Sequence, residues 1–309
     1  MTPRTATLAG LILCALLLGG PAPLQARSAM PSYGLEARET ALVHDRGFMS
    51  VGLQDPLRWA PARGIELQTH PLLLVGSPNV RVRVGHLVRT TRFGPVRLTG
   101  EYGLFFPSPA FHLPVPVGLQ GYFTPTCAVK ADDESRAGTC QRPGWILVPN
   151  VGLLFSWGER HVLTARVDAA AGILLSGSRG RPRDTWTPLD LKLAPVFNVF
   201  RVRLGLRYDR QILRWLRLAA RVDLWVVGPG PEPRRDPLVF SAWLGADFAL
   251  GRYTRLSVGV IYYNADQHRV ELREGSDGYG RFVRVRSNDV YPTLDFIWSW
   301  SLGPAATAK

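Results

Sequence analysis

The sequence has little lysine, cysteine or methionine, and it lacks a long uninterrupted apolar run. Lys130, Lys192 and Lys309 are the only lysines among 37 basic residues, so arginine carries nearly all of the positive charge behind the formal net charge of +13. The longest apolar run lies at the N-terminus and is shorter than the roughly 20 residues that a transmembrane helix needs, which excludes a helical membrane protein. At 46% apolar residues the chain is too apolar for a disordered protein. Its 31 glycines and 25 prolines indicate many turns.

The N-terminus has the organisation of a secretory signal peptide. Arg4 precedes an apolar core at Leu8–Leu18, and the helix-breaking Pro21 and small residues up to Ala26 follow it. We expect cleavage after Ala26, which leaves one mature domain over residues 27–309. The alternative is an N-terminal helix that belongs to the fold.

Two cysteines remain in the mature chain, Cys127 and Cys140. Because an exported protein meets an oxidising environment, their proximity predicts one disulfide. The loop that they enclose is short, so the bond would contribute about 3 kcal/mol on the chain-entropy model. The alternative is two free thiols.

Apolar and polar residues alternate along most of the mature chain. Between Leu216 and Val227, for example, Leu218 and Val222 share one face while Arg217 and Arg221 share the other. This period of two is typical of β-strands whose faces meet different environments. The clearest stretches are Met49–Trp59, Ile65–His70, Val80–Val88, Val96–Phe106, Ile146–Trp157, Val162–Ile173, Val199–Asp209, Leu216–Val227, Leu238–Ala249, Arg255–Asn264 and Tyr291–Leu302.

Most of these stretches have about ten residues, the length of a tilted strand that crosses a bilayer and about twice that of a typical soluble strand. Lipid cannot satisfy the hydrogen bonds of a sheet edge, so the strands must close into a barrel. The fold class that we predict is all-β, an antiparallel transmembrane β-barrel. The alternative is a soluble exported sandwich or lipocalin-like barrel, whose outer face would be polar. Tryptophans near strand ends are typical of aromatic girdles: Trp145, Trp157, Trp215, Trp298 and Trp300.

The connections between the strands are unequal, as in outer-membrane barrels. Gly158–His161 and Gly251–Thr254 are tight, and we assign them to the periplasmic side. The long connections, assigned to the outside, are Pro107–Gly144, Leu174–Pro188, Gly228–Asp236 and Ala265–Val290. An even strand count needs one strand more than the eleven stretches above, and Glu36–His44 is the candidate. We therefore predict 12 strands, with 10 to 14 open, and Trp186–Phe197 either extends the next strand or forms its own hairpin.

One segment resembles a known group of proteins. The residues Pro56 to Trp59, followed by Gly64 to Pro71, are similar to a hairpin of uncharacterised, porin-like outer-membrane β-barrel proteins of Gram-negative bacteria. The similarity covers about Thr40 to Val84, and it implies a location in the outer membrane but no activity. The last strand resembles the signal that the barrel assembly machinery reads, in which alternating apolar residues end on an aromatic. Trp298 and Trp300 match that pattern, whereas the tail after Leu302 departs from it.

The phases of the strands predict a lumen lined with charge. Arginines outnumber carboxylates on the inward faces, although most of the excess positive charge lies in loops. Either the arginines pair with carboxylates and close a narrow barrel, or a water-filled lumen favours small anions. The residues that we predict to line the lumen are Arg81, Arg83, Arg97, Glu101, Arg166, Asp168, Arg201, Arg203, Arg207, Arg217, Arg221, Asp223, Arg255 and Asp295.

Three functions remain open from the sequence: a passive pore for small, preferably anionic solutes, a sealed barrel that acts through its loops, and a lipid-modifying enzyme. Catalysis has weak support, because Glu66 and His70 are too far apart along one strand face, and Ser156 and His161 flank a periplasmic turn. No pattern predicts a metal site or a cofactor. Outer-membrane lipids and lipopolysaccharide phosphates are the expected partners, and secretion argues against nucleic acid. The sequence does not predict an oligomeric state.

Overall fold

The computed structural model describes residues 39–74, 78–92, 94–107, 144–177, 191, 194–196, 198–229, 236–251, 253–274 and 280–301. The strands, with one short helix, follow in this order: β1 (Phe48–Gly52), β2 (Leu57–Ala62), β3 (Ile65–Thr69), α2 (Pro71–Leu74), β4 (Asn79–Thr91), β5 (Gly94–Phe105), β6 (Trp145–Trp157), β7 (His161–Ala171), β8 (Ile173–Ser176), β9 (Phe200–Leu213), β10 (Leu216–Val227), β11 (Leu238–Ala249), β12 (Thr254–Glu274) and β13 (Gly280–Ser301).

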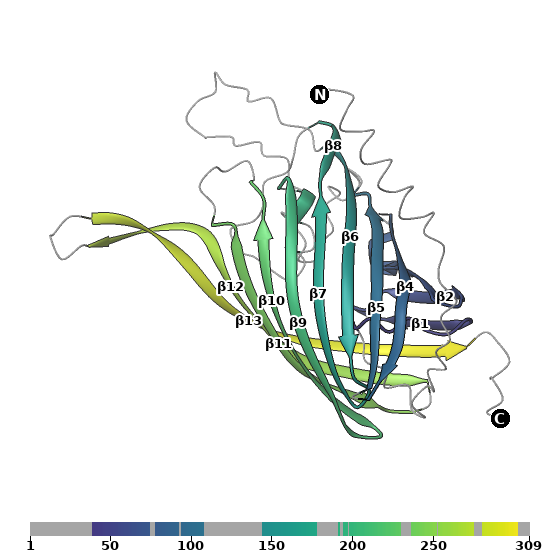
Figure 1. Cartoon of the computed structure of the whole chain (residues 1–309). Coiled ribbons are helices and arrows are strands. Elements are labelled where there is room, and N and C mark those ends of the chain that lie inside the picture. The colour runs from purple at the N-terminus through teal and green to yellow at the C-terminus, as the bar shows by residue number, and fades with distance from the viewer. Residues whose placement is uncertain are drawn as a thin grey trace, which may run out of the picture.

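Twelve strands form a closed antiparallel barrel. Each strand pairs with its neighbour in sequence, β7 pairs with β9, and β1 pairs with β13 to close the ring. β8 continues β7 beyond Gly172 and pairs with the first residues of β6, so it is not counted as a separate strand of the barrel wall. The predicted all-β class and strand count are therefore confirmed (Figure 1).

The two faces of the barrel wall differ in polarity. Outward side chains such as Leu163, Leu204, Leu206 and Val222 are apolar and exposed, while the alternate positions are buried and mostly polar. A soluble barrel would have the opposite arrangement, with a polar outer face and an apolar interior. Exposed tryptophans lie near strand ends, as predicted: Trp145, Trp157, Trp215 and Trp298. The outer surface is therefore suited to contact with lipid.

No helix in the described part of the chain is long and apolar enough to cross a membrane.

The connections define two ends of the barrel. The turn end carries the short links between β6 and β7 and between β11 and β12, as predicted, and also the short link between β9 and β10. Gly158 adopts a φ of +105° in the first of these links, a conformation that favours glycine. The loop end carries the longer links, and Figure 1 shows β12 and β13 reaching beyond the other strands there.

The N-terminal strands correct one prediction. Met49–Trp59 is not one strand, because residues 53–56 form a turn between β1 and β2. Asp295 in β13 accepts a hydrogen bond from the Gln54 N–H at 3.0 Å, and Asp55 pairs with Arg58, so side chains hold the turn. The twelfth strand arises from this split. Residues 39–44, the described part of the candidate Glu36–His44, do not form a strand. They lie inside the barrel, where side chains of the wall form hydrogen bonds with their backbone.

Two predictions for the loop end are also corrected. Ala265–Val290 is not a loop, because the ladder between β12 and β13 continues to the pair Glu274 and Gly280. Trp186–Phe197 forms neither a strand extension nor a hairpin in its described part, since Leu191 and residues 194–196 are helical. Leu191 and Ala194 are three residues apart, a helical spacing, and both are buried against Trp225.

Residues 1–26, Cys127 and Cys140 lie outside the described residues. The signal peptide, the domain boundary at Ala26 and the disulfide stay predictions.

Candidate functional site: the charged lumen

The antiparallel register sets inward residues of neighbouring strands directly opposite one another. One such row crosses the wall from β3 to β9, and we call it the carboxylate row. Opposite charges alternate along it. Gly152 lies between the two carboxylates Glu101 and Asp168. The members of the row are Glu66, Arg83, Glu101, Gly152, Asp168 and Arg203.

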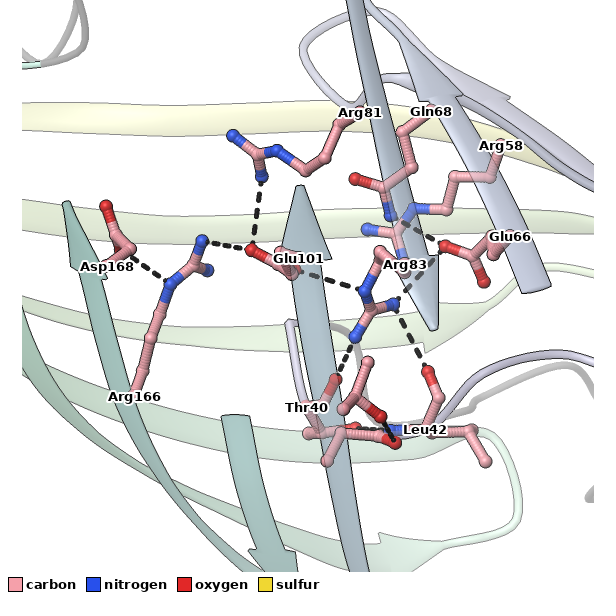
Figure 2. A network of polar contacts seen from close by, with 12 residues as sticks. Thr40, Leu42, Arg58, Glu66, Gln68, Arg81, Arg83, Glu101, Arg166 and Asp168 are labelled. Carbon is pink, nitrogen blue, oxygen red and sulfur yellow. Dashed lines mark hydrogen bonds and ion pairs between the residues drawn. The ribbon is translucent and has the colours of Figure 1, made fainter. Parts of the chain in front are cut away.

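Glu101 is the centre of one half of the carboxylate row. Arg83 Nε lies 3.0 Å from Glu101 Oε1, and Arg166 Nη2 lies 2.7 Å from Oε2 (Figure 2). Arg81 approaches the same Oε2 at 3.5 Å. Arg83 also reaches Glu66 Oε1 at 3.3 Å, so one guanidinium links two carboxylates. All of these groups except Arg81 have nearly fully buried side chains, which strengthens their mutual attraction.

Asp168 is the centre of the other half. Arg166 Nε donates to Asp168 Oδ2 at 2.8 Å, while Arg201 and Arg203 lie 3.6 and 3.7 Å from the carboxylate. Arg203 makes its shorter contact, 2.8 Å, with Asp223 Oδ1 in β10. Arg166 thus joins the two halves into one continuous network.

Asp223 and Asp209 extend the network toward the turn end. Asp223 Oδ2 lies 2.9 Å from Arg221 Nε, and Arg207 holds Asp209 through two hydrogen bonds of 2.8 Å. Such fork-on-fork pairs combine charge with fixed geometry.

The structure places the predicted lumen residues as follows. Arg81 and Arg97 are half-buried, the side chains of Arg166 and Arg221 are 10% and 17% exposed, and the other ten residues are buried. Arg97 donates to the Gly158 carbonyl at 3.3 Å and therefore holds a turn. Near the turn end, Arg217 contacts Gln211, Arg255 approaches Asp247 at 4.0 Å, and Asp295 holds the turn after β1.

Sequence reasoning missed the lumen segment, the name we give to residues 39–47, which lies across the interior. Thr99 Oγ1 donates to the Ala41 carbonyl, and the Ala41 N–H donates to Ser156 Oγ, both at 2.7 Å. Arg83 donates to the carbonyls of Thr40 and Leu42 (Figure 2). These contacts satisfy backbone groups that would otherwise be buried without partners.

Both ends of the lumen segment are held by charge. Glu39 pairs with Arg207 and Arg221, on β9 and β10. Burial would raise the pKa of the Glu39 carboxyl, but Arg221 and Arg207 outweigh it and hold that pKa well below the usual range. At the other end, His44 Nδ1 donates to Glu66 on β3, and its ring stacks on Phe48 with centroids 3.7 Å apart. The segment therefore bridges opposite parts of the wall.

Two inward tryptophans were also missed. The guanidinium groups of Arg201 and Arg203 lie 5.3 and 4.9 Å from the Trp225 ring centroid, within cation–π range. The guanidinium groups of Arg207 and Arg221 likewise lie 5.4 and 5.9 Å from the Trp243 ring centroid. Both tryptophans follow the inward phase of their strands, so alternation could have found them. The lumen segment gave no such signal, because its short alternation also fits a strand.

An apolar cluster lies on the inner face of β10, β11 and β12 near the loop end. Leu191 and Ala194 pack on Trp225, Val239 and Ile261. Arg201 Nη1 donates to the Leu191 carbonyl at 2.8 Å, which ties the helical turn to the barrel wall.

The residue pairs considered for catalysis are not brought together. Glu66 contacts His44, and His70 contacts the Gln54 carbonyl. Ser156 faces the lumen and bonds Thr164, whereas His161 is exposed and bonds Tyr208. No group of three or more potential metal ligands occurs among the described residues.

Comparisons with known proteins find distant structural similarity alone. No family model matches the sequence, and no curated protein matches it. OmpT of Vibrio cholerae aligns over 79% of this chain at 9% identity with a TM-score of 0.39, and this chain covers 64% of its length. The outer-membrane channel DcaP of Acinetobacter baumannii aligns over 81% at 12% identity and a TM-score of 0.32, with 62% of its length covered. The translocator domain of the autotransporter NalP from Neisseria meningitidis aligns over 81% at 12% identity and a TM-score of 0.30, with 85% covered. These are distant likenesses to outer-membrane barrels, and the architecture itself is assigned from the strand pairing of this chain.

Proposed function

We propose that the protein is an outer-membrane β-barrel that gives small solutes a narrow passage and prefers anions. The exposed apolar outer wall supports a lipid environment, and a bacterial barrel of this kind belongs to the outer membrane. The observation that supports the preference for anions is the charge of the inward side chains. Arginines surround both Glu101 and Asp168, and they outnumber these carboxylates. A lumen of this sign attracts anions and repels cations.

The lumen segment narrows this passage. It contacts β3, β4, β5, β6, β9 and β10, so solutes must pass beside it. The passage that we propose is therefore small, and its width depends on how firmly the segment is held.

A sealed barrel that acts through its loops is the second candidate. The observation that favours it is the burial of the network, since Glu66 and Asp209 have no exposed surface. Charged groups that are satisfied by one another need no water-filled channel.

Conductance of the refolded protein in planar bilayers separates these two functions. We expect discrete current steps, and a reversal potential in a potassium chloride gradient that indicates chloride selectivity. Cation selectivity would contradict the anion preference. A silent wild type, together with a silent variant in which Glu39→Gln loosens the lumen segment, would favour the sealed barrel.

Lipid is the partner that the outer wall supports, and lipopolysaccharide phosphates suit the arginine-rich loops. We propose that the barrel assembly machinery recognises β13, in which the rings of Phe296 and Trp298 meet edge to face near the C-terminal end of the strand. Replacing both aromatics by alanine should lower the amount of folded protein in the outer membrane, measured by heat-dependent migration on gels. An unchanged amount would contradict this role.

A further inference from the structure

The turn end of the barrel carries an excess of exposed arginine. Alternate links of an antiparallel barrel share one end, so the links between β2 and β3 and between β4 and β5 lie there too. The start of β1 also lies at this end, because it pairs with the end of β13. Among the described residues of the turn end, two acids are exposed, Asp45 and Glu159. The exposed arginines, which we call the basic rim, are Arg46, Arg63, Arg89, Arg92, Arg160, Arg210 and Arg214.

Along β9 the outward face changes from apolar to basic at this end. The outward phase of the strand runs through four exposed side chains, Leu204, Leu206, Tyr208 and Arg210. Lipid can cover the first three, whereas a guanidinium group within the hydrocarbon core is costly. Arg210 therefore marks the point where the wall leaves the apolar part of the membrane.

Aromatic side chains fix the depth of Arg210. Trp157 on β6 and Tyr208 on β9 are exposed and lie in one row, with Leu163 of β7 between them. Exposed aromatics at the rim of a membrane barrel lie at the level of the lipid headgroups. Arg210 follows two residues after Tyr208, about 7 Å farther along the strand. Arg89 on β4 lies in the row of Trp157 itself, so both arginines are placed at the headgroup level.

Arg160 lies beside Arg210. Arg210 pairs with His161, the first residue of β7. The Gln211 N–H donates to the Arg160 carbonyl at 2.9 Å, and the Tyr208 hydroxyl lies 2.7 Å from His161 Nδ1. The two arginines thus belong to neighbouring strands, whose axes are about 4.8 Å apart. Both side chains are long and exposed, so they can reach a common anion.

We propose that Arg160 and Arg210 bind the phosphate of an anionic phospholipid, such as phosphatidylglycerol, in the leaflet that meets the turn end. Guanidinium groups pair with phosphate oxygens in a fixed fork geometry. An anionic bilayer surface attracts arginines close to it, and the whole basic rim adds to this attraction. A zwitterionic lipid carries its own ammonium group, which the rim repels. The inference rests on the lipid environment of the proposed function, and it does not depend on a passage through the barrel.

The apolar surface next to the two arginines favours a lipid over a soluble anion. Leu163 on β7 and Leu206 on β9 are exposed on the outward face, on the membrane side of Arg160 and Arg210. Acyl chains joined to a phosphate at the arginines would lie on these side chains and bury apolar surface. A soluble phosphate would gain no such contact.

Native mass spectrometry of the refolded protein in a neutral detergent tests the site without transport. Equal amounts of phosphatidylglycerol and phosphatidylcholine are added, and the ratio of the two lipids retained on the protein is measured. We expect the wild type to retain phosphatidylglycerol in excess. Arg210→Gln should lower the ratio about fivefold, the contribution of one arginine near an anionic surface. The double variant Arg160→Gln/Arg210→Gln should lower it further.

Two further variants serve as controls. Arg286→Gln removes an exposed arginine near the loop end that is bonded to Asp236 and to the Leu238 carbonyl, so it should leave the ratio unchanged. Glu159→Gln removes the acid next to Arg160 and should raise the ratio. Such a gain cannot result from a failure to fold.

Four results would overturn the site: equal retention of both lipids by the wild type, an unchanged ratio in the double variant, an equal loss in Arg286→Gln, or displacement of the lipid by an equal concentration of inorganic phosphate. The last result would indicate a soluble ligand. The outcome is separate from that of the proposed function. A barrel that conducts anions but does not distinguish the two lipids loses the site and keeps the passage, and a silent barrel that retains phosphatidylglycerol keeps the site.

Discussion

At the scale of single residues, the charged lumen depends on positions that have no side chain. Gly205 in β9 lies opposite Asp223 in β10, and a Cβ there would overlap Asp223 Oδ1. The glycine therefore lets the carboxylate lie against the wall, where it reaches both Arg203 and Arg221. Moving Asp223 would leave two buried guanidinium groups less well paired, which is costly in a low dielectric.

We predict that Gly205→Ala lowers the free energy of unfolding by about 1–3 kcal/mol, the usual cost of overpacking. Urea unfolding in lipid vesicles, followed by tryptophan fluorescence, measures this difference. Gly251→Ala is the control, because a Cβ at Gly251 meets nothing within 4 Å. Equal stability of the two variants would show that the space beside Asp223 is not needed.

At the scale of elements, the lumen segment is held by few bonds spread over many strands. Glu39 is its link to β9 and β10, and Arg207 and Arg221 keep Asp209 and Asp223 as partners when Glu39 is neutral. Loss of the Glu39 charge therefore loosens the segment without leaving the arginines alone. The wall itself should stay intact.

We predict that Glu39→Gln raises the undocked population of the lumen segment about tenfold, since a charge-assisted hydrogen bond contributes roughly 1.5–3 kcal/mol. Hydrogen exchange at the Ala41 amide, which donates to Ser156, measures the population directly. Asp45→Asn in the same segment is the matched control, because Asp45 is exposed. Slow exchange at Ala41 in both variants would contradict the prediction.

The same contact predicts a pH dependence. The pKa of Glu39 is lowered in the folded protein, so its contribution is present above the unfolded value of about 4.3 and is lost as the pH falls through the folded value. The difference in Ala41 exchange between wild type and Glu39→Gln should therefore stay constant from about pH 7 to pH 5 and shrink only in stronger acid. A difference that vanishes near neutral pH would contradict the lowered pKa.

At the scale of the whole molecule, the barrel is inside-out relative to a soluble protein. Leu206, in the middle of β9, is 52% exposed, while Arg207 beside it is buried. This inversion is stable only if lipid covers the outer wall. Leu175 is 56% exposed but lies in β8, beyond the break at Gly172 near the loop end.

We predict that Leu206→Arg destabilises the barrel in lipid vesicles by about 2–4 kcal/mol, the cost of a cation near the bilayer midplane. Leu175→Arg, equally exposed but close to the loop end, should cost much less. Equilibrium unfolding of both variants in vesicles provides the comparison. Equal costs would indicate that no membrane covers Leu206.

Alternation along each strand was sufficient to assign the barrel, because the period of two depends only on local geometry. It predicted most strand positions and the shared face of Arg201, Arg203 and Arg207. It did not predict the turn at residues 53–56, where a hydrogen bond from Gln54 to the distant Asp295 decides the conformation. The continuation of β12 and β13 was also missed, because the segment was assigned to a long loop, whereas the backbone ladder runs on to the pair Glu274 and Gly280.

The sequence by itself determined that this chain closes into an antiparallel barrel with arginines inside, since both follow from the local alternation of residues. Only the tertiary structure decided which arginine meets which carboxylate, because pairing depends on the register between strands far apart in sequence. It also decided that residues 39–47 occupy the interior. Their partners Arg83, Ser156 and Arg221 come from three separate strands, and no local pattern brings these together.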